Sequence, residues 1–408
     1  MKTHHAGLLA VVLMLAVAGC APTPGSTDTA ASVEPSVSSV ASASPSERAA
    51  AFPTAAFADI REDPVSDEAA GEFQAILSEA AGGAGGGGMT ATVMSANGTW
   101  SGAVGTADGV RDMRPDDQLA IGSITKSVIA AQVMQLVEAG ELALDDPATD
   151  HLPADLDFDT NEATIGQLMG MRSGIPDYVD ALWDSLSTDP QRSWTTAEVL
   201  ELVADSRSPA GDAYQYSSTN YVLLGLVIEQ VRQRPLAKVL RDGVLSGNGL
   251  ERLVFQPEEV PTEPMAMPFG QSSSALEAGS GYLPSLGGAT AAGAAGAMAS
   301  DSASLARWWS RFCGGELVSE ASLTEMTTSS WIVVLDEGET DKYGLGLVDG
   351  TEAHGTLAVG HGGIHVGYTA WAMCFVEDGS VVVVLTNREG DRGVIEVADA
   401  LAVAARSD

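Results

Sequence analysis

The segment between Ser123 and Gly140 constrains the fold more strongly than any other, because it has a helical pattern and little polarity. The pattern stops at Gly140, a residue type common just beyond helix ends. A helix that is apolar on all sides has to be buried, since a surface helix needs a polar face for water. We therefore expect this helix at the centre of the fold. The residues that set the pattern are Val128, Ile129, Val133, Met134, Leu136 and Val137.

Strand patterns lie near both ends of the chain, and helical patterns lie between them and at the C-terminus. Alternating, β-branched residues after Met89, the turn signal Asn97-Gly98 and the segment Thr99–Val104 predict a β-hairpin. Further strands are predicted over residues 331–335, 345–348, 365–375 and 380–386, and helices over 72–81, 195–204, 221–232, 305–312 and 393–405. This order predicts an α/β domain made from both chain ends, with a mainly helical insert at about 145–285.

The N-terminus has the pattern of an export signal. Lys2 precedes an apolar run, Leu8–Ala18, which is too short to span a bilayer but suits the core of a signal peptide. The run ends in Val-Ala-Gly-Cys at positions 17–20, which resembles the bacterial lipobox. We expect residues 1–20 to be a lipoprotein signal peptide and Cys20 to be the lipidated first residue of the mature protein, on the outer face of the cell membrane. The alternative is an ordinary leader cleaved nearby, which would release a secreted protein.

Residues 21–60 are predicted to be a disordered tether, and residues 61–408 a folded domain. From Ala21 to about Ser46 the chain is mainly Ala, Ser, Thr, Pro and Val without an apolar period. Such a segment cannot bury enough surface to offset the entropy of ordering it. We expect it to hold the domain away from the membrane, which the protein would contact only through its lipid anchor.

The formal net charge is −35, from 55 acidic and 20 basic residues. Such a surface repels nucleic acid and anionic lipid headgroups, so we exclude nucleic acid as a partner. An acidic surface that keeps the protein soluble explains the charge without a charge-specific partner. We expect the protein to be a monomer.

Two cysteines, Cys313 and Cys374, remain after the N-terminal leader. In an oxidising compartment two thiols of one domain often pair, so a disulfide between them is possible. The sequence leaves this question open, because it does not tell whether the two Cα atoms lie within bridging range.

The segment Gly-Ser-Ile-Thr-Lys-Ser at positions 122–127 stands directly before the apolar helix. A serine hydroxyl is a weak nucleophile, and acyl transfer needs a base within hydrogen-bond reach of it. Ser123 and Lys126 are three residues apart, so they share one face of a helix. Lysine acts as a base only when it is neutral, and burial favours the neutral form. The short motif can arise by chance, but its place at the positive end of a helix dipole favours the functional interpretation.

Several segments, in the same order along the chain, resemble motifs of the serine β-lactamase-like hydrolases. This family includes class C β-lactamases, D-alanyl-D-alanine carboxypeptidases and related esterases. The resemblance extends from about Phe73 to Ala404, and ordered matches over such a length are more specific than any single motif. It implies the penicillin-binding-protein fold, with an antiparallel central sheet flanked by helices. The matching segments are residues 119–127 (LAIGSITKS), 142–147 (LALDDP), 164–169 (TIGQLM), 173–178 (SGIPDY), 216–225 (YSSTNYVLLG), 343–346 (YGLG) and 360–368 (GHGGIHVGY).

The resemblance also implies roles for individual residues of the first two motifs. Ser123 would be the nucleophile and Lys126 its partner. Tyr216, in the second motif, would exchange protons with the nucleophile and the leaving group, as a phenolate whose pKa is lowered by cationic neighbours such as Lys126. The alternative for Tyr216 is an interface aromatic whose hydroxyl only caps a loop.

The third motif corresponds to His361-Gly362-Gly363. His361 would line the cleft and position Tyr216 or a substrate carboxylate, and Gly363 would let the substrate lie against the strand. The backbone N–H groups of Ser123 and Ile364 would form the oxyanion hole. The alternative for His361 is a loop histidine without a catalytic part.

Ser218 departs from the family pattern, since the second motif usually reads Tyr-x-Asn and this chain has serine in the third position. A hydroxyl lacks the reach of an amide and its paired donor and acceptor. Contacts with a substrate amide are therefore weakened, and we hypothesise that the enzyme prefers esters or small amides to β-lactams.

The function implied is a serine acyl hydrolase that works through an acyl-enzyme on Ser123 and takes a small peptide, β-lactam or ester substrate without a cofactor. A D-alanyl-D-alanine carboxypeptidase, a β-lactamase and an esterase would share these groups. One alternative is a surface lipoprotein with the same fold that binds peptidoglycan-type ligands without turnover. A metallohydrolase is disfavoured: His361 and His365 could share a strand face, but Gly362 stands where a zinc protease helix carries glutamate.

Overall fold

The computed structural model describes residues 50–82, 86–270, 281–328, 331–334, 340–354 and 356–406. The predicted signal peptide, Cys20 and most of the predicted tether lie outside these ranges. No helix within them is both long and apolar enough to cross a bilayer.

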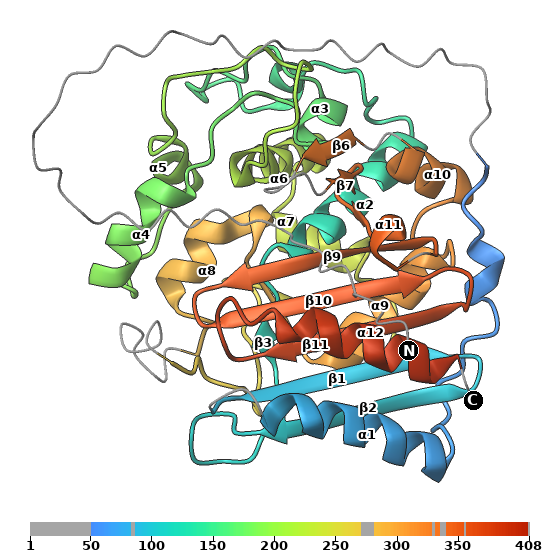
Figure 1. Cartoon of the computed structure of the whole chain (residues 1–408). Helices are drawn as coiled ribbons and strands as arrows, with labels where there is room; N and C mark the ends of the chain where they lie inside the picture. The colour runs from blue at the N-terminus through green and yellow to red at the C-terminus, as the bar shows by residue number, and fades with distance from the viewer. Residues whose placement is uncertain are drawn as a thin grey trace, which may run out of the picture.

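An eight-stranded antiparallel sheet lies at the centre of the molecule (Figure 1). Its order is β2-β1-β11-β10-β9-β8-β7-β6, so strands from the two chain ends are neighbours. Met89 in β1, for example, pairs with Thr386 in β11. The predicted α/β fold with an antiparallel central sheet is confirmed. The strands are β1 (Gly88–Ser95), β2 (Gly98–Gly105), β6 (Trp331–Val334), β7 (Thr340–Tyr343), β8 (Val348–Asp349), β9 (Ala358–His365), β10 (Tyr368–Phe375) and β11 (Ser380–Thr386).

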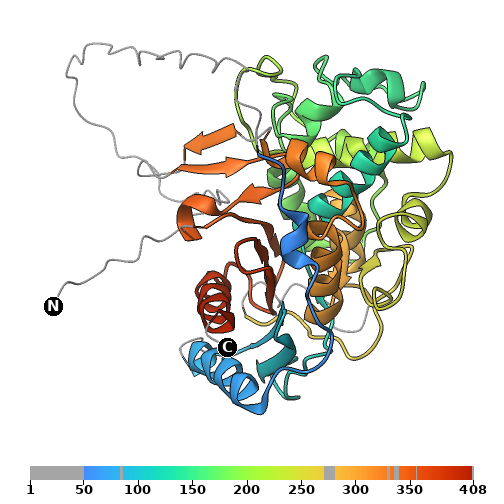
Figure 2. The ribbon, with the colours of Figure 1, turned by 90° about the vertical axis from the view of Figure 1, so that its right-hand side faces the viewer.

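Helices cover both faces of this sheet (Figure 2). On one face α1 (Asp67–Gly82) and α12 (Gly393–Ala405) pack side by side, and on the other α9 (Ser302–Cys313) packs against β1, β10 and β11. Every residue of β1, β10 and β11 is buried. Burial on both faces explains why β10 and β11 are apolar at almost every position instead of alternating.

The apolar helix predicted after Ser123 is α2 (Ile124–Glu138), and 12 of its 15 residues are buried. It lies between the sheet and a group of helices from the middle of the chain (Figure 1). A second, three-stranded sheet in the order β3-β5-β4 was not predicted, because its strands are too short to set a pattern. The remaining elements are η1 (Thr54–Phe57), β3 (Leu119–Ala120), η2 (Ala148–His151), α3 (Ile165–Met169), α4 (Val179–Thr188), α5 (Thr196–Leu200), α6 (Ser218–Arg232), α7 (Leu236–Asp242), β4 (Val254–Phe255), α8 (Leu286–Ala292), η4 (Gly293–Ala295), β5 (Met298–Ser300), α10 (Glu320–Thr328) and α11 (Thr351–His354).

Three predicted elements differ from the structure. The strand predicted over residues 365–375 begins only at Tyr368, because the chain reverses between His365 and Tyr368, where Gly367 has a φ of +79°; the preceding strand β9 was not predicted. The strand predicted over 345–348 begins only at Val348, and β7 before it was missed. The helix predicted over 195–204 ends at Leu200. In each case an apolar run continues through a turn, so periodicity alone misses the boundary.

The predicted tether extends too far toward the domain. Phe52 and Phe57 are 3% and 4% exposed and belong to the main hydrophobic core. The short helix η1, which carries Phe57, packs against α9. Residues 52–57 are therefore part of the folded domain, although the domain was expected to begin at residue 61.

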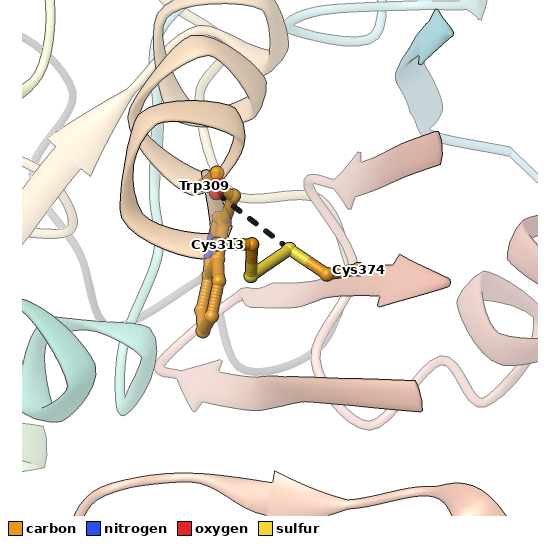
Figure 3. Close-up of a disulfide and its surroundings, with 3 residues drawn as sticks. All are labelled: Trp309, Cys313 and Cys374. Carbon is orange, nitrogen blue, oxygen red and sulfur yellow. Dashed lines mark hydrogen bonds between the residues drawn. A yellow bond between two sulfur atoms is a disulfide. The ribbon is translucent and has the colours of Figure 1, made fainter. Parts of the chain in front are cut away.

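Cys313 and Cys374 form a disulfide that joins the end of α9 to β10 (Figure 3). Their Cα atoms are 6.9 Å apart and both residues are fully buried. The Sγ of Cys374 also lies 3.6 Å from the carbonyl oxygen of Trp309, one turn earlier in α9. The bridge thus fixes α9 on the inner face of the sheet.

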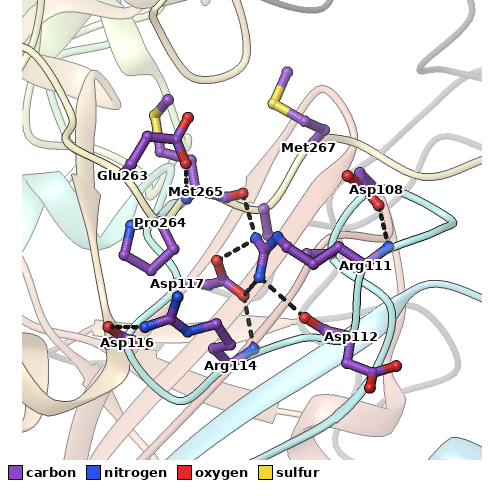
Figure 4. A network of polar contacts seen from close by, with 12 residues as sticks. Asp108, Arg111, Asp112, Arg114, Asp116, Asp117, Glu263, Pro264, Met265 and Met267 are labelled. Atoms are coloured by element: carbon purple, nitrogen blue, oxygen red, sulfur yellow. Dashed lines mark hydrogen bonds and ion pairs between the residues drawn. The ribbon is translucent and has the colours of Figure 1, made fainter.

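An ion pair between a buried carboxylate and a partly exposed guanidinium holds the loop that leads to α2 (Figure 4). The Asp117 carboxylate is fully buried and accepts two hydrogen bonds from the Arg111 guanidinium, at 2.6 and 3.1 Å, and one from the backbone N–H of Arg114 at 2.7 Å. Arg111 also donates to the carbonyl oxygen of Met265 at 3.0 Å. The pair therefore ties the chain just before β3 to a segment some 150 residues later.

Replacing Arg111 with alanine should destabilise the fold, because it leaves the Asp117 carboxylate buried without a cation. We expect the free energy of unfolding, measured by urea denaturation, to fall by about 3 kcal/mol. Arg114→Ala is the matched control: its side chain pairs with Asp116 on the surface, and the loss should stay below about 1 kcal/mol. Equal losses in the two variants would contradict this account of the loop.

Candidate active site

Gly122 and Ser123 connect β3 to α2 at the point where β9 passes closest. Gly122 has a φ of +51°, and a Cβ there would lie 2.6 Å from the carbonyl oxygen of Ile364 in β9. Glycine is required for both reasons. Ser123 is the N-cap residue of α2, so its side chain lies at the positive end of the helix dipole.

Lys126 lies one turn into α2 and is 1% exposed. Its Nζ is 2.9 Å from Ser123 Oγ and donates to the carbonyl oxygen of Ala295 at 2.8 Å. Burial lowers the pKa of Lys126 to about 7, although the negative charge of Asp177 acts in the opposite direction. At neutral pH a large share of Lys126 is therefore uncharged. A neutral amine can keep its hydrogen bond to Ala295 and accept the proton of Ser123.

Tyr216 lies beside this pair, just before α6. Its hydroxyl is hydrogen-bonded to Ser123, and Lys126 Nζ lies 5.0 Å from the centre of its ring. Burial raises the pKa of Tyr216 above its usual range, and the charge of Asp177 raises it further despite the bond to Ser123. The predicted phenolate is thus wrong for the free enzyme, because burial and the charge of Asp177 disfavour the ionised phenol and the bond to Ser123 only partly offsets them. Tyr216 is a neutral phenol that can donate a proton to a leaving group.

His361 contacts Tyr343 and not Tyr216. Its Nδ1 lies 2.5 Å from the carbonyl oxygen of Gly362, which fixes the proton on Nδ1, so Nε2 accepts from the Tyr343 hydroxyl at 3.0 Å. Burial lowers the pKa of His361 to about 3, and it is uncharged at neutral pH. The Tyr343 ring in turn packs edge-on against Tyr216, with centroids 6.1 Å apart. His361 therefore positions Tyr216 only through Tyr343.

Gly363 lets β9 lie directly against the nucleophile. A Cβ at this position would lie 2.0 Å from the carbonyl oxygen of Ile121 and 3.1 Å from the backbone nitrogen of Ser123. On the other side of this contact, a Cβ on Gly122 would lie 2.6 Å from the carbonyl oxygen of Ile364. Within the described ranges, the N–H of Ser123 donates no hydrogen bond. The two amides expected to form the oxyanion hole thus come from adjacent backbone segments.

Ser218 begins α6, and its backbone N–H donates to Asp177 Oδ2 at 3.1 Å. Its hydroxyl also contacts this carboxylate. Asp177 precedes α4, and the N–H of Val179 lies 3.2 Å from its Oδ1. Burial raises the pKa of Asp177, partly offset by the Ser218 N–H and by Lys126. The serine that departs from the family motif therefore contacts a carboxylate beside the site.

His365 lies on the same face of β9 as His361, at the other side of Gly363. Its Nδ1 accepts from the N–H of Val366 at 2.9 Å, and its ring faces Gly288 at the start of α8. Burial lowers its pKa to about 4. Across the described part of the chain, no group of three or more His, Cys, Asp and Glu side chains is arranged to hold a metal ion.

A family model described as Beta-lactamase matches residues 48–406. The chain belongs to the beta-lactamase family. Its predicted family is therefore confirmed, and the molecule has the serine beta-lactamase fold. Curated relatives include penicillin-binding protein 4* of Bacillus subtilis (strain 168), 25% identical over 69% of this chain, and penicillin-binding protein 4 of Amycolatopsis lactamdurans, 34% identical over 35% of it. The matches span 63% and 38% of those proteins, less than two thirds of their length.

Solved structures of the beta-lactamase fold resemble the chain over most of its length. A D-stereospecific amidohydrolase from Streptomyces sp. is 27% identical with a TM-score of 0.68, covering 82% of this chain and 98% of its own. An octameric penicillin-binding protein homologue from Pyrococcus abyssi is 26% identical, with a TM-score of 0.67 and coverage of 83% and 77%. D-amino acid amidase from Ochrobactrum anthropi SV3, at 24% identity and a TM-score of 0.72, covers 84% and 99% and shares the fold.

The sequence predicted that residues of the three motifs form the site, but it did not assign a role to three of their neighbours. Tyr343 and Asp177 lie inside matched segments, and no role was assigned to them. Ala295 contributes only its carbonyl oxygen, which leaves no trace in side-chain identity. Both had a usable signal: Tyr343 opens a matched motif at the end of β7, and Asp177 is the one carboxylate of the matched segment 173–178.

The rate at which a fluorophosphonate modifies Ser123 should depend on the neutral form of Lys126. The neutral amine predominates above a pKa of about 7 and is lost below it, so we expect the rate to rise about tenfold per pH unit up to pH 7 and then to level off. Asp177→Asn removes a charge that raises the pKa of Lys126, and should move the midpoint to lower pH. A rate independent of pH between 5 and 8 would rule out Lys126 as the base.

Proposed function

We propose that this protein hydrolyses small amides and esters through an acyl-enzyme on Ser123. The observation that carries the proposal is the contact between Ser123 Oγ and Lys126 Nζ, 2.9 Å apart, with burial lowering the pKa of Lys126 to about 7. The amine is neutral near the pH at which the enzyme would work, so it can take the proton of the hydroxyl as the carbonyl is attacked.

The remaining steps use groups that lie around this pair. The N–H groups of Ser123 and Ile364 would stabilise the oxyanion of the tetrahedral intermediate. Tyr216, as a neutral phenol, would donate its proton to the departing nitrogen or oxygen and recover one from Lys126. A water molecule would then attack the acyl-enzyme by the reverse route, with the same groups accepting its proton.

Mass spectrometry of the intact protein tests the nucleophile. After exposure to a fluorophosphonate we expect one adduct per molecule, absent in Ser123→Ala. Ser78→Ala is the matched control, because Ser78 is exposed on α1 and its hydroxyl bonds to Gln74 of the same helix. An adduct on Ser123→Ala would place the nucleophile elsewhere, and amidase activity that survives in this variant but is abolished by a chelator would favour a metallohydrolase; either result would sink the proposal.

Penicillin in the same experiment separates the candidate activities. The curated relatives are named penicillin-binding proteins, which favours a D-alanyl-D-alanine carboxypeptidase as the second candidate function. A long-lived penicillin adduct on Ser123 with turnover of a D-alanyl-D-alanine peptide would support that candidate. Stable labelling without turnover of any ester, amide or peptide would support the surface lipoprotein that binds ligands.

The serine at position 218 predicts the order of reactivity between substrate classes. Its hydroxyl contacts Asp177, so it is less able than the usual asparagine amide to hold the side-chain amide of a β-lactam. We expect kcat/KM for a short-chain aryl ester to exceed that for a cephalosporin by at least about tenfold. Ser218→Asn should narrow this ratio, while faster cephalosporin hydrolysis by the wild type would refute the hypothesis.

A further inference from the structure

The charges around Ser123 differ from those of a site built for a substrate carboxylate. A β-lactam and a D-alanyl-D-alanine peptide both carry a carboxylate, and a cation that stays charged at working pH favours recognition of it. The basic groups nearest Ser123 are Lys126, His361 and His365. Burial lowers their pKa values to about 7, 3 and 4, so neither histidine is charged at neutral pH.

Two charged groups dominate the electrostatics around Ser123. The charged groups that act on Lys126, Tyr216 and the two histidines are Lys126 itself and Asp177. None of the ion pairs within the described ranges involves Lys126, Tyr216, His361 or His365. Once Lys126 serves as the base in its neutral form, the charge that remains from this pair is the negative one of Asp177.

One carboxylate is present instead, that of Asp177. It is largely buried, is held by the N–H groups of Ser218 and Val179, and acts electrostatically on both Lys126 and Tyr216. Two backbone N–H groups and one hydroxyl leave further acceptor capacity on its two oxygens. Burial raises its pKa because the partners that it has do not fully offset the loss of water.

Asp177 is held in part by the residue that departs from the family motif. Ser218 lies two residues after Tyr216, and both its backbone N–H and its hydroxyl bond to this carboxylate, which comes from the segment before α4. An asparagine at 218 would be longer and would present its own amide there. The chain has thus replaced a neutral amide at this edge of the site by a hydroxyl backed by a negative charge.

We propose that Asp177, with Ser218, forms a binding site for a substrate ammonium group, so that the preferred substrates are amides or esters of amino acids with a free amino group. The proposal deepens and rests on the proposed acyl-enzyme function of Ser123. A bound ammonium supplies a counter-charge to Asp177, whereas a substrate carboxylate is repelled by it. Specificity then comes from attraction of one charge and repulsion of the other.

Three substrates with one leaving group test this site at pH 7. They are D-alanine p-nitroanilide, which carries an ammonium group, its neutral N-acetyl derivative and its anionic N-succinyl derivative. We expect kcat/KM to fall in that order, with at least about tenfold between the first two. A wild type that prefers the succinyl substrate, or does not distinguish the three, overturns the proposal without any variant.

The Asp177→Asn variant assigns the preference to this carboxylate. The ratio of kcat/KM for the ammonium substrate to that for the acetyl substrate should fall at least about tenfold, and the ratio cancels any change in the pKa of Lys126. Asp180→Asn, which alters an exposed carboxylate on α4, is the matched control and should leave the ratio unchanged. An unchanged ratio in Asp177→Asn overturns the proposal.

Fluorophosphonate labelling keeps the two proposals distinguishable. If Ser123 is labelled and the acetyl substrate is hydrolysed, but Asp177→Asn keeps the wild-type ratio, only the ammonium site fails. If Ser123 is not labelled in the wild type and none of the three substrates is hydrolysed, the acyl-enzyme function itself fails. Normal labelling of Asp177→Asn also establishes that the variant is folded.

Discussion

The burial of one amine, that of Lys126, is the constraint on which the rest of the structure depends. A charged ammonium would be costly at this depth, and the protein compensates it with only one carbonyl oxygen, one hydroxyl and the more distant charge of Asp177. The equilibrium therefore moves toward the neutral amine. The same burial that makes α2 a core helix thus gives its only lysine the protonation state that a base requires.

Close backbone approach is the second requirement, and two glycines meet it. Gly122 and Gly363 face one another across the contact between the start of α2 and β9, where any side chain would collide with a carbonyl group. This contact puts the N–H groups of Ser123 and Ile364 on neighbouring segments. The central sheet holds the contact in place, because β9 is paired on both sides and is packed against α2. The Cys313–Cys374 bridge and the Arg111–Asp117 pair fix the elements around it.

The electrostatics of the site follow from the same burial. Both histidines of β9 and the surrounding tyrosines are uncharged at neutral pH, since burial disfavours their charged forms. Proton transfer around Ser123 would then take place among neutral groups, with the Asp177 carboxylate nearby. In this respect the site differs from one in which a cation and a phenolate transfer the protons. The charge of Asp177 then determines which sign of substrate charge the site favours.

The sequence by itself determined the family, the nucleophile segment, the buried helix and most of the strands, because each has a local signature. A motif needs only a few residues at fixed spacing, and an apolar helix or a continuous strand repeats its pattern over many residues. Periodicity failed where apolar runs pass through a turn, as between β9 and β10. Only the tertiary structure decided which groups meet: that His361 bonds to Tyr343, that Ala295 offers its carbonyl to Lys126, and that Asp177 lies behind Ser218. It also decided the protonation of Tyr216, because a pKa depends on burial and on charges brought together from distant parts of the chain.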